Sequence, residues 1–413
     1  MKIPNPQPTA LRRSKVAGLR SPLPTLRDQT GQTSSSITSG AKPSEKIVIS
    51  GCDYLGLSDD AVIREAWLKA SASGPLQTGA SRATTGDHPL YRRAEKAIAD
   101  FLNEPAAVLT ATGYLASLAV AQGLRDQATH VVVDASAHNC VQDGARLSGL
   151  PILSFASGDV RALYSKLRGL PPSARPLVAT DGVYGIRGGM APLKDYLEAL
   201  PASGWLWVDD AHGLGSVGAT GRGSPEFFGL RDSRLIRSVT FSKALAVAGG
   251  AVIGEASLME QVRTRAGAYL GSSAPPLAIA AAIAAAVVRV HKLPGRVRRL
   301  QELARRFSTA LPTRPEIFND ARTPVTAIHP RNAAQAQRLT KALTQAGFVP
   351  PWIRYPGGLK RIAATVSKSG RPITGESRRL PETPHHDGGG RVHYGQSPRL
   401  TSALDDHHWP RPR

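Results

Sequence analysis

Between residue 47 and about residue 290, short apolar runs alternate with longer segments in which apolar residues recur at helical spacing. The runs that we interpret as buried strands are 106–109, 130–133, 152–155, 177–180, 206–208, 238–241 and 251–253. Strands that alternate with helices form βαβ units, whose strands are parallel because each crossover returns the chain to the same edge. The pattern predicts an α/β fold whose large domain, 47–290, is built on a mostly parallel sheet covered by helices.

The alternation continues on a smaller scale after the large domain. An Arg-rich amphipathic segment follows Pro294, and an apolar run, 323–328, precedes a second helical pattern, 333–346. These elements predict a smaller α+β C-terminal domain, 291–366. We expect this domain to be incomplete, because apolar periodicity is lost soon after Gly358.

The two ends of the chain have a different composition. Residues 1–46 are rich in Pro, Ser, Thr and Arg, which is typical of an N-terminal extension without a core of its own. Residues 367–413 are rich in Arg, His, Pro, Gly and Ser, and we expect a basic tail of low order. Such a tail is compatible with a disordered appendage and with a shifted reading frame near Gly358.

The net charge of +21 is high for a metabolic enzyme. The basic residues are scattered and only 5% of the residues are aromatic, so the pattern argues against a nucleic-acid partner. A positive field would instead favour anionic substrates such as acyl-CoA thioesters and dicarboxylates.

Three further features of the sequence bear on the cellular compartment and on metal binding. The Ala-rich stretch 277–288 is too short to span a bilayer, so it predicts a buried helix and no membrane partner. The polar N-terminus lacks the apolar segment of a secretory signal. The two cysteines, Cys52 and Cys140, form neither a disulfide framework nor a metal cluster, so we expect a cytoplasmic protein without a metal.

Two short motifs carry the candidate chemistry of the chain. Asp209 and His212 follow the apolar run that ends at Val208, and Lys243 follows the run that ends at Phe241. Polar residues at the carboxyl ends of parallel strands lie where open α/β sheets bind ligands. A carboxylate, an imidazole and an amine in that place fit pyridoxal 5'-phosphate, which needs a lysine for its Schiff base and an acid opposite the pyridine nitrogen.

Each of these side chains suits one task. The Asp209 carboxylate would favour the protonated pyridine ring, which makes the ring an electron sink. Lys243 would activate the aldehyde and then serve as a nearby amine for proton transfer. His212 could reach the ring hydroxyl. Either motif alone is compatible with an ordinary strand-end carboxylate or a solvated lysine, but their occurrence together in this order favours the cofactor.

With these motifs the chain resembles the α-oxoamine synthases, pyridoxal-phosphate enzymes of fold type I that condense an amino acid with an acyl-CoA. The resemblance covers residues 51 to 356. It rests on the motifs at 53–58, 79–82, 86–90, 112–114, 134–139, 180–184, 209–213 and 240–243. The number and order of these motifs make the resemblance specific.

The resemblance implies a role for each catalytic position. Lys243 would be the Schiff-base lysine, Asp209 the partner of the pyridine nitrogen and His212 the partner of the ring hydroxyl. His138 would stack on the ring face opposite the incoming amino acid. A lone histidine in such a loop is otherwise more often a satisfied structural residue.

The resemblance also implies how the phosphate is held. Gly113 and Tyr114 would open a helix whose backbone amides bind the phosphate, and Thr240 would add a hydroxyl. Ser272 or Ser273 would reach the phosphate of the neighbouring subunit, which implies a homodimer with shared active sites. The same Ser-Ser pair before two prolines is also compatible with an ordinary turn.

Some positions depart from the family pattern. Cys52 stands where the family usually has Asn, and Gly185 and Arg187 stand where it usually has Ser and an acidic residue. For the substrate-binding arginines, Arg361 is the nearby match to the C-terminal arginine that grips the amino-acid carboxylate. Arg20 is a loose candidate for the N-terminal one.

The implied activity is a decarboxylative condensation of an amino acid with an acyl-CoA or acyl-carrier-protein thioester. Within the family we expect the type that joins L-alanine to a pimeloyl thioester in biotin synthesis. The alternatives are a glycine-using enzyme of the glycine C-acetyltransferase or 5-aminolevulinate synthase type, or an inactive relative that binds the cofactor and has an altered C-terminus.

Overall fold

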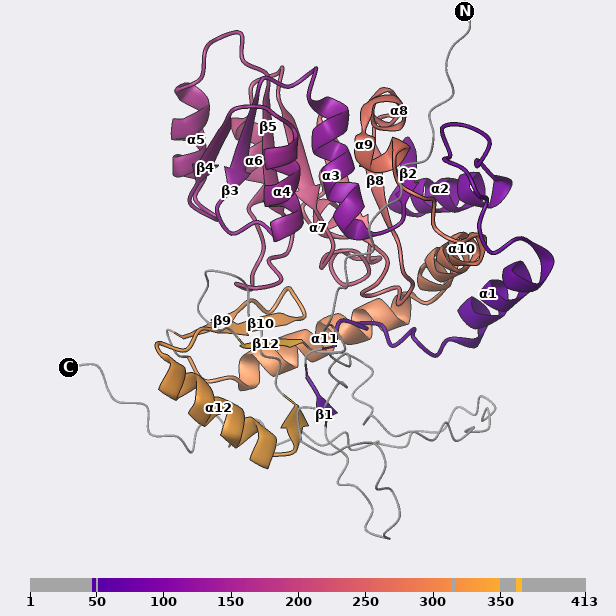
Figure 1. Ribbon diagram of the computed structural model, residues 1–413. Coiled ribbons are helices and arrows are strands. Elements are labelled where there is room, and N and C mark those ends of the chain that lie inside the picture. Colours follow the sequence, from indigo (N-terminus) through magenta and orange to yellow (C-terminus); the bar gives the residue numbers. More distant parts are fainter. Residues whose placement is uncertain (1–46, 50, 314–315, 350–361, 366–413) are drawn as a thin grey trace, which may run out of the picture. The chain divides into compact units, whose positions relative to one another are not determined.

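The computed structural model describes residues 47–49, 51–313, 316–349 and 362–365. Its largest sheet has seven strands in the order β2-β8-β7-β6-β5-β3-β4 (Figure 1). These strands are β2 (Ala106–Thr110), β3 (His130–Asp134), β4 (Ile152–Phe155), β5 (Pro176–Asp181), β6 (Trp205–Asp209), β7 (Leu235–Thr240) and β8 (Gly250–Gly254). Each predicted strand of this region is present, so the predicted α/β fold with a mostly parallel sheet is confirmed.

The strand directions explain where polar side chains gather. The pairs β4–β3, β3–β5, β5–β6 and β6–β7 are parallel, whereas β8 runs antiparallel to both of its neighbours, β7 and β2. It follows that β2 runs in the same direction as β7. The carboxyl ends of β2, β3, β5, β6 and β7 therefore lie at one edge of the sheet, together with the start of β8.

Helices alternate with these strands along the chain. They are α1 (Ala61–Ser73), α2 (Pro89–Leu102), α3 (Gly113–Leu124), α4 (Asn139–Leu147), α5 (Val160–Arg168), α6 (Leu193–Ala199), α7 (Ser224–Phe227), α8 (Ala256–Arg265), α9 (Gly267–Leu270) and α10 (Leu277–Lys292). Several of these helices are capped at their N-terminus by a short polar side chain. Thr112 caps α3 and Asp159 caps α5 by accepting hydrogen bonds from first-turn amides, which have no partner within the helix.

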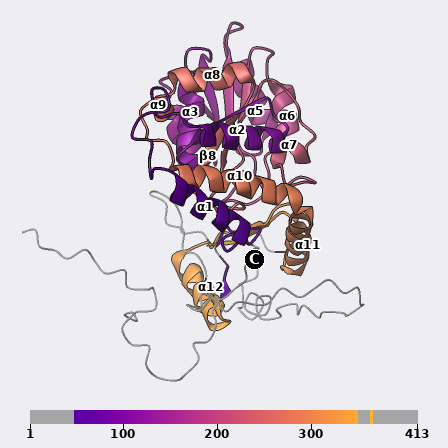
Figure 2. The ribbon, with the colours of Figure 1, turned by 90° about the vertical axis from the view of Figure 1, so that its right-hand side faces the viewer.

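Both faces of the sheet are covered by helices (Figures 1 and 2). Successive strand residues point to opposite faces, so Val131 and Val133 of β3 join a core with α3, α4 and α8, whereas Val132 joins a core with α5 and α6. A third core packs β2, β7 and β8 against α2 and α10. Burial on both faces explains why these strands read as continuous apolar runs.

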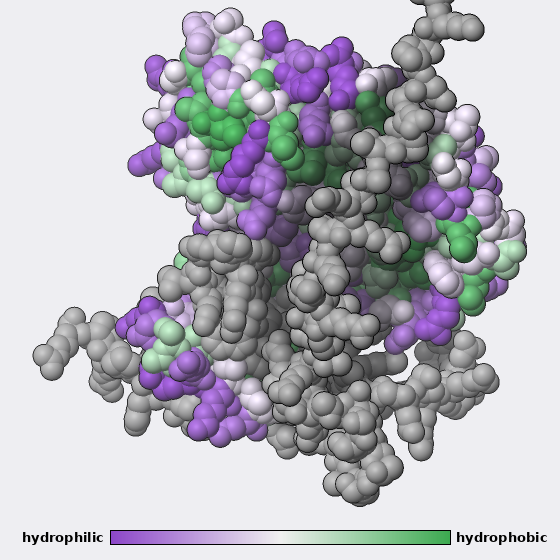
Figure 3. Space-filling model, in the orientation of Figure 1, coloured by the Kyte–Doolittle hydropathy of each residue, from purple (hydrophilic) through white to green (hydrophobic). Residues whose placement is uncertain are grey.

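The edge strand β4 is less well covered than the central strands. Ile152 on β4 is 43% exposed, and Leu147 on the adjacent α4 is 57% exposed. Figure 3 shows a hydrophobic patch over this part of the molecule. β5 and β7, in contrast, are buried along their whole length, so the polar residues at their ends lie within the protein rather than on its surface.

The remaining elements form a smaller region of strands and helices. A three-stranded antiparallel sheet has the order β12-β10-β9, with β9 (Ile317–Asn319), β10 (Val325–Ile328) and β12 (Ile362–Thr365). The helices α11 (Pro294–Ala310) and α12 (Ala333–Gln345) lie where helical periodicity predicts them. β1 (Ile47–Val48) pairs in parallel with β11 (Phe348–Val349), so the first described residues join this region.

Among the described helices, none alone combines the length and apolar character needed to cross a bilayer; α10 and α11 meet this test only as a pair, and they are bent by 73°.

A buried ion pair joins the turn after β6 to the middle of β7. Arg237 Nη2 lies 2.7 Å from Asp210 Oδ2, and their side chains are 2% and 0% exposed. Burial raises the pKa of Asp210, while Arg237 and Ser224 oppose this shift. Asp210, the second aspartate of the Asp-Asp motif, therefore has a structural role as the partner of Arg237. Asp209, the first aspartate, has no such ion pair among the described side chains.

Removal of this arginine should be costly. Arg237→Ala would leave the Asp210 carboxylate buried without its counter-ion, and we expect the free energy of unfolding to fall by about 3–5 kcal/mol. Arg234→Ala is the matched control, because its pair with Asp232 is partly exposed and should contribute about 0–1 kcal/mol. Urea unfolding of both variants checks this, and equal losses would contradict it.

Candidate active site

A cavity of about 370 Å³ opens at the edge where the parallel strands end. Its walls come from the turns after β2, β3, β5, β6 and β7 and from the segment before β8. The lining residues are Thr112, Gly113, Tyr114, His138, Cys140, Asp181, Val183, Asp209, Ala211, His212, Val239, Thr240, Ser242, Lys243, Ala248 and Gly249. Residues that are up to 137 positions apart in sequence, such as Thr112 and Gly249, thus meet in one place.

Most of the candidate residues named from the sequence line this cavity. They are Gly113, Tyr114, His138, Asp209, His212, Thr240 and Lys243. Ser272 and Ser273 do not line it; they follow α9 in the same chain. Arg20 and Arg361 lie outside the described residues, although β12, which directly follows Arg361, is present.

The Asp209 carboxylate is buried and is held by hydrogen-bond donors from the protein side. Oδ2 accepts from Ser117 Oγ at 3.0 Å and from Cys140 Sγ at 3.2 Å, and Oδ1 accepts from the Ala211 amide at 3.0 Å. Ser117 and Cys140 were not predicted from the sequence, because they lie on α3 and α4 and carry no motif of their own. The donors fix the orientation of the carboxylate at the cavity wall.

A second carboxylate, that of Asp181, lies beside Asp209. The two residues are register partners on β5 and β6, and both line the cavity. Burial raises the pKa of Asp181 well above its usual value, and the neighbouring Asp209 carboxylate adds to this shift. Asp181 Oδ1 accepts a hydrogen bond from the His138 amide at 2.9 Å, so Asp181 positions the loop that carries His138.

The two histidines of the site are favoured in their neutral form. Burial lowers the pKa of His212 well below its usual value, and the positive charge of Lys243 acts in the same direction. His212 Nδ1 lies 2.7 Å from Tyr54 Oη, a contact that joins the turn after β6 to the motif at 53–58. Burial also lowers the pKa of His138, against the opposing effect of Asp209.

Cys140 belongs to the same cluster as His138. Its sulfur lies 2.9 Å from His138 Nδ1, and burial raises the pKa of the thiol far above its usual value, with Asp209 adding to the shift. Burial therefore disfavours the thiolate form, and the thiol serves in this cluster as a hydrogen-bonding group.

Gly113 permits a close approach of backbone to the β7 end. A Cβ at this position would lie 2.6 Å from Thr240 Cβ. Gly113 begins α3 and lines the cavity, and the first-turn amides of such a helix can bind an anion. Thr112 caps the helix with a 3.2 Å hydrogen bond from the Leu115 amide. The Thr240 hydroxyl lies 2.7 Å from Ser242 Oγ and donates to the Gly249 carbonyl at 3.1 Å.

Two departures from the family pattern have a clear place in the structure. Arg187 lies over the Tyr184 ring, with 4.8 Å between the guanidinium carbon and the ring centroid, and it does not line the cavity. Gly185 lies against the edge of His212, because a Cβ there would be 2.2 Å from Nε2. In this chain the imidazole occupies the space that a serine side chain would take.

We therefore expect Gly185→Ala to displace His212 and to lower kcat by on the order of 100-fold, the effect of a misplacement of about 1 Å. Gly295→Ala is the control, because a Cβ at Gly295 meets no atom within 4 Å. Steady-state turnover of both variants tests the expectation. Wild-type turnover of Gly185→Ala would show that the close approach has no consequence.

The residues of the cavity fit pyridoxal phosphate. Asp209 is buried, and among the described side chains no cation forms an ion pair with it, so a protonated pyridine nitrogen would supply a counter-charge. Lys243 supplies an amine on the same wall, and the start of α3 supplies amides for a phosphate. Within the described ranges no three His, Cys, Asp or Glu side chains form a metal-binding group.

Comparison with known proteins gives the same result. Residues 44–367 match the family described as aminotransferase class I and II. The 8-amino-7-oxononanoate synthase of Thioalkalivibrio sulfidiphilus is 34% identical over 327 residues, which is 78% of this chain and 83% of that protein. The enzyme of the same name from Symbiobacterium thermophilum is 32% identical over 344 residues, or 83% of this chain and 86% of that protein.

Solved structures agree with this assignment. Serine palmitoyltransferase from S. paucimobilis matches with a TM-score of 0.73 and 25% identity, over 78% of this chain and 82% of that chain. The 8-amino-7-oxononanoate synthase from Francisella tularensis shares the fold, with a TM-score of 0.68 and 21% identity over 87% of this chain and 96% of that one. The chain thus belongs to the aminotransferase class I and II family, as a pyridoxal-phosphate-dependent acyltransferase of the α-oxoamine synthase group.

Proposed function

We propose that this enzyme is an 8-amino-7-oxononanoate synthase, which joins L-alanine to a pimeloyl thioester of coenzyme A or of a carrier protein. The bond that forms links the alanine α-carbon to the acyl carbonyl. The thioester C–S bond and the bond from the α-carbon to its carboxylate break, with release of the thiol and carbon dioxide. The relatives that carry this name at 34% identity are the observation that supports this choice of substrate.

The chemistry that pyridoxal phosphate supplies when bound is an electron sink for the α-carbon of the amino acid. Asp209 would lie opposite the pyridine nitrogen, and the donors from Ser117 and Cys140 hold that carboxylate in place. Lys243 would bind the cofactor and would then move the α-proton of the substrate. His138 would stack on the ring face, and His212 would donate a hydrogen bond to the ring hydroxyl.

The substrate carboxylate and the second subunit complete the proposed site. Arg361 would form a bidentate pair with the alanine carboxylate, which orients the α-carbon, and Arg20 is the candidate at the other end of the chain. Ser272 and Ser273 would contact the phosphate held by the partner subunit, so the enzyme would act as a homodimer. We place it in the cytoplasm.

A substrate panel tests the proposal. The purified protein, loaded with pyridoxal phosphate, is offered L-alanine, glycine or L-serine with pimeloyl-, acetyl-, succinyl- or palmitoyl-CoA, and thiol and carbon dioxide release are measured. We expect the highest kcat/KM for L-alanine with pimeloyl-CoA. Preference for glycine would favour the glycine C-acetyltransferase or 5-aminolevulinate synthase type. Cofactor binding without turnover on any pair would favour an inactive relative.

A further inference from the structure

The segment that carries Ser272 and Ser273 is held by hydrogen bonds from side chains elsewhere in the chain. Residues 271–276 form neither helix nor strand, and Pro275 and Pro276 have no amide to donate. Ala274 and Pro275 of this segment are buried, so their carbonyls need hydrogen-bond donors. Such a segment can be positioned by side chains from another part of the chain.

Those side chains come from a single neighbouring stretch, residues 77–91. Ser81 Oγ donates to the Leu270 carbonyl at 2.9 Å, Gln77 Nε2 to the Ala274 carbonyl at 2.8 Å and Tyr91 Oη to the Pro275 carbonyl at 2.8 Å. The three acceptors lie on both sides of the serine pair. Tyr91 is completely buried, so its hydroxyl has a fixed position.

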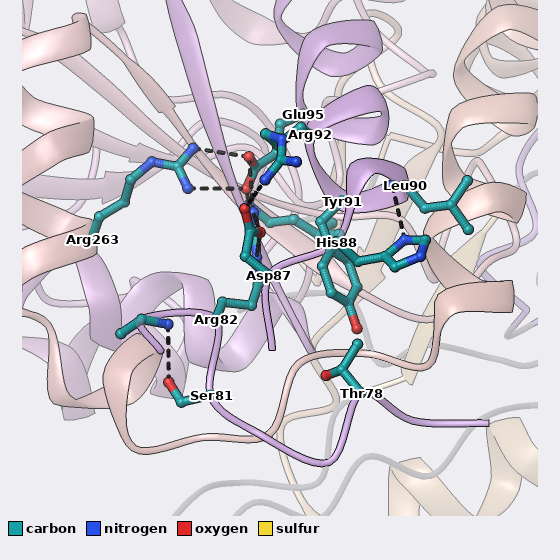
Figure 4. A network of polar contacts seen from close by, with 12 residues as sticks. Thr78, Ser81, Arg82, Asp87, His88, Leu90, Tyr91, Arg92, Glu95 and Arg263 are labelled. Atoms are coloured by element: carbon teal, nitrogen blue, oxygen red, sulfur yellow. Dashed lines mark hydrogen bonds and ion pairs between the residues drawn. The ribbon is translucent and has the colours of Figure 1, made fainter. Parts of the chain in front are cut away.

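A buried ion cluster fixes this stretch in turn (Figure 4). Arg82 makes two contacts with Glu95 of α2, at 2.6 and 3.2 Å, and Arg263 of α8 lies 2.9 Å from the same carboxylate. Arg82 Nε also donates to Asp87 at 3.0 Å. The side chains of Arg82 and Glu95 are 3% and 7% exposed. The cluster therefore joins the loop before α2 to two helices.

The same cluster reaches the serine segment through aromatic rings. The Arg82 guanidinium carbon lies 4.8 Å from the centroid of the Tyr91 ring and 5.6 Å from that of Tyr269. Arg263 Nη1 donates to Tyr269 Oη at 3.3 Å. Tyr269 belongs to α9, the helix that directly precedes the serine segment.

We infer that the Arg82–Glu95–Arg263 cluster, acting through Tyr91, Gln77 and Ser81, positions Ser272 and Ser273 to bind the cofactor phosphate of the partner subunit. These are positioning residues, because none of them lines the cavity. The inference rests on the proposed function of the serine pair. It assigns the motifs at 79–82 and 86–90 to phosphate binding in the other active site.

The test compares two ligands of the apoenzyme, pyridoxal phosphate and pyridoxal, which lacks the phosphate. Tyr91→Phe removes one hydroxyl and should raise the Kd of pyridoxal phosphate by about two- to tenfold, the factor for one hydrogen bond. Arg263→Ala should act in the same direction. The Kd of pyridoxal should not change, because this ligand has no phosphate for the serines to bind. A general loss of structure would instead weaken the binding of both ligands.

Matched controls are available on exposed helix positions. Tyr164→Phe changes an exposed tyrosine of α5, and Arg265→Ala removes an exposed arginine two positions from Arg263 on α8. Neither should change either Kd. In the Ser272→Ala/Ser273→Ala background, Tyr91→Phe should have no further effect on the Kd of pyridoxal phosphate.

Three results would overturn the inference. Equal weakening of both ligands by Tyr91→Phe would show a merely structural role, and an unchanged Kd would show that the hydroxyl does not position the serines. If the double serine variant bound pyridoxal phosphate like the wild type, the proposed role of the serine pair would fail as well. Formation of the covalent link at Lys243 reports on cofactor binding independently of these outcomes.

Discussion

Lys243→Ala is expected to abolish covalent attachment of pyridoxal phosphate and to lower turnover by on the order of 100- to 10,000-fold, the range for loss of a general acid–base group. Lys243 lies on the cavity wall after β7, next to Ser242 and near the Gly113 turn. The visible absorption band of the cofactor and the rate of thiol release measure both effects.

An exposed lysine serves as the control for this variant. Lys194 on α6 has a side chain that is 65% exposed and lies 4.0 Å from Glu198. Lys194→Ala should retain the absorption band and wild-type turnover. A Lys243→Ala protein that keeps its band after dialysis and turns over normally would contradict the assignment.

Asp209→Asn is expected to lower kcat by on the order of 100- to 1,000-fold while the protein still folds, because it removes a fixed charge from the reacting centre. The amide keeps a similar shape and can hydrogen-bond. It cannot balance the charge of a protonated pyridine ring. Kinetics of the loaded variant, together with its unfolding curve, separate the loss of activity from any loss of stability.

The neighbouring residue offers a contrasting variant. Asp210 faces Arg237 and Ser224 instead of the cavity, so Asp210→Asn should lower stability more than turnover. The two substitutions are chemically identical and one position apart. If Asp209→Asn lost stability and kept its turnover, the roles of the two aspartates would be reversed.

The sequence was sufficient to predict the seven strands of the large sheet and the polar residues at the ends of β6 and β7. Buried parallel strands read as short apolar runs, and Asp209, His212 and Lys243 directly follow such runs. The antiparallel direction of β8 was not predicted, because the short connection from Thr240 to Gly250 has no pattern that distinguishes a hairpin from a crossover.

Contacts between distant parts of the chain could not be predicted either. Tyr54 and His212 are 158 positions apart, and Cys140 and Asp209 are 69 apart. From the sequence, Cys140 was expected only to form neither a disulfide nor a metal site. The structure places its thiol between His138 and the Asp209 carboxylate. Such pairings depend on strand order and on the direction in which each helix returns, which a local pattern does not contain.

Peptide mapping after borohydride reduction tests the central claim most directly. The wild-type protein is loaded with pyridoxal phosphate, reduced and digested, and the modified peptide is identified by mass spectrometry. We predict that the pyridoxyl group is found on Lys243, in the peptide that follows β7. A stoichiometric label on a different lysine, or a protein that takes up no label, would contradict the account.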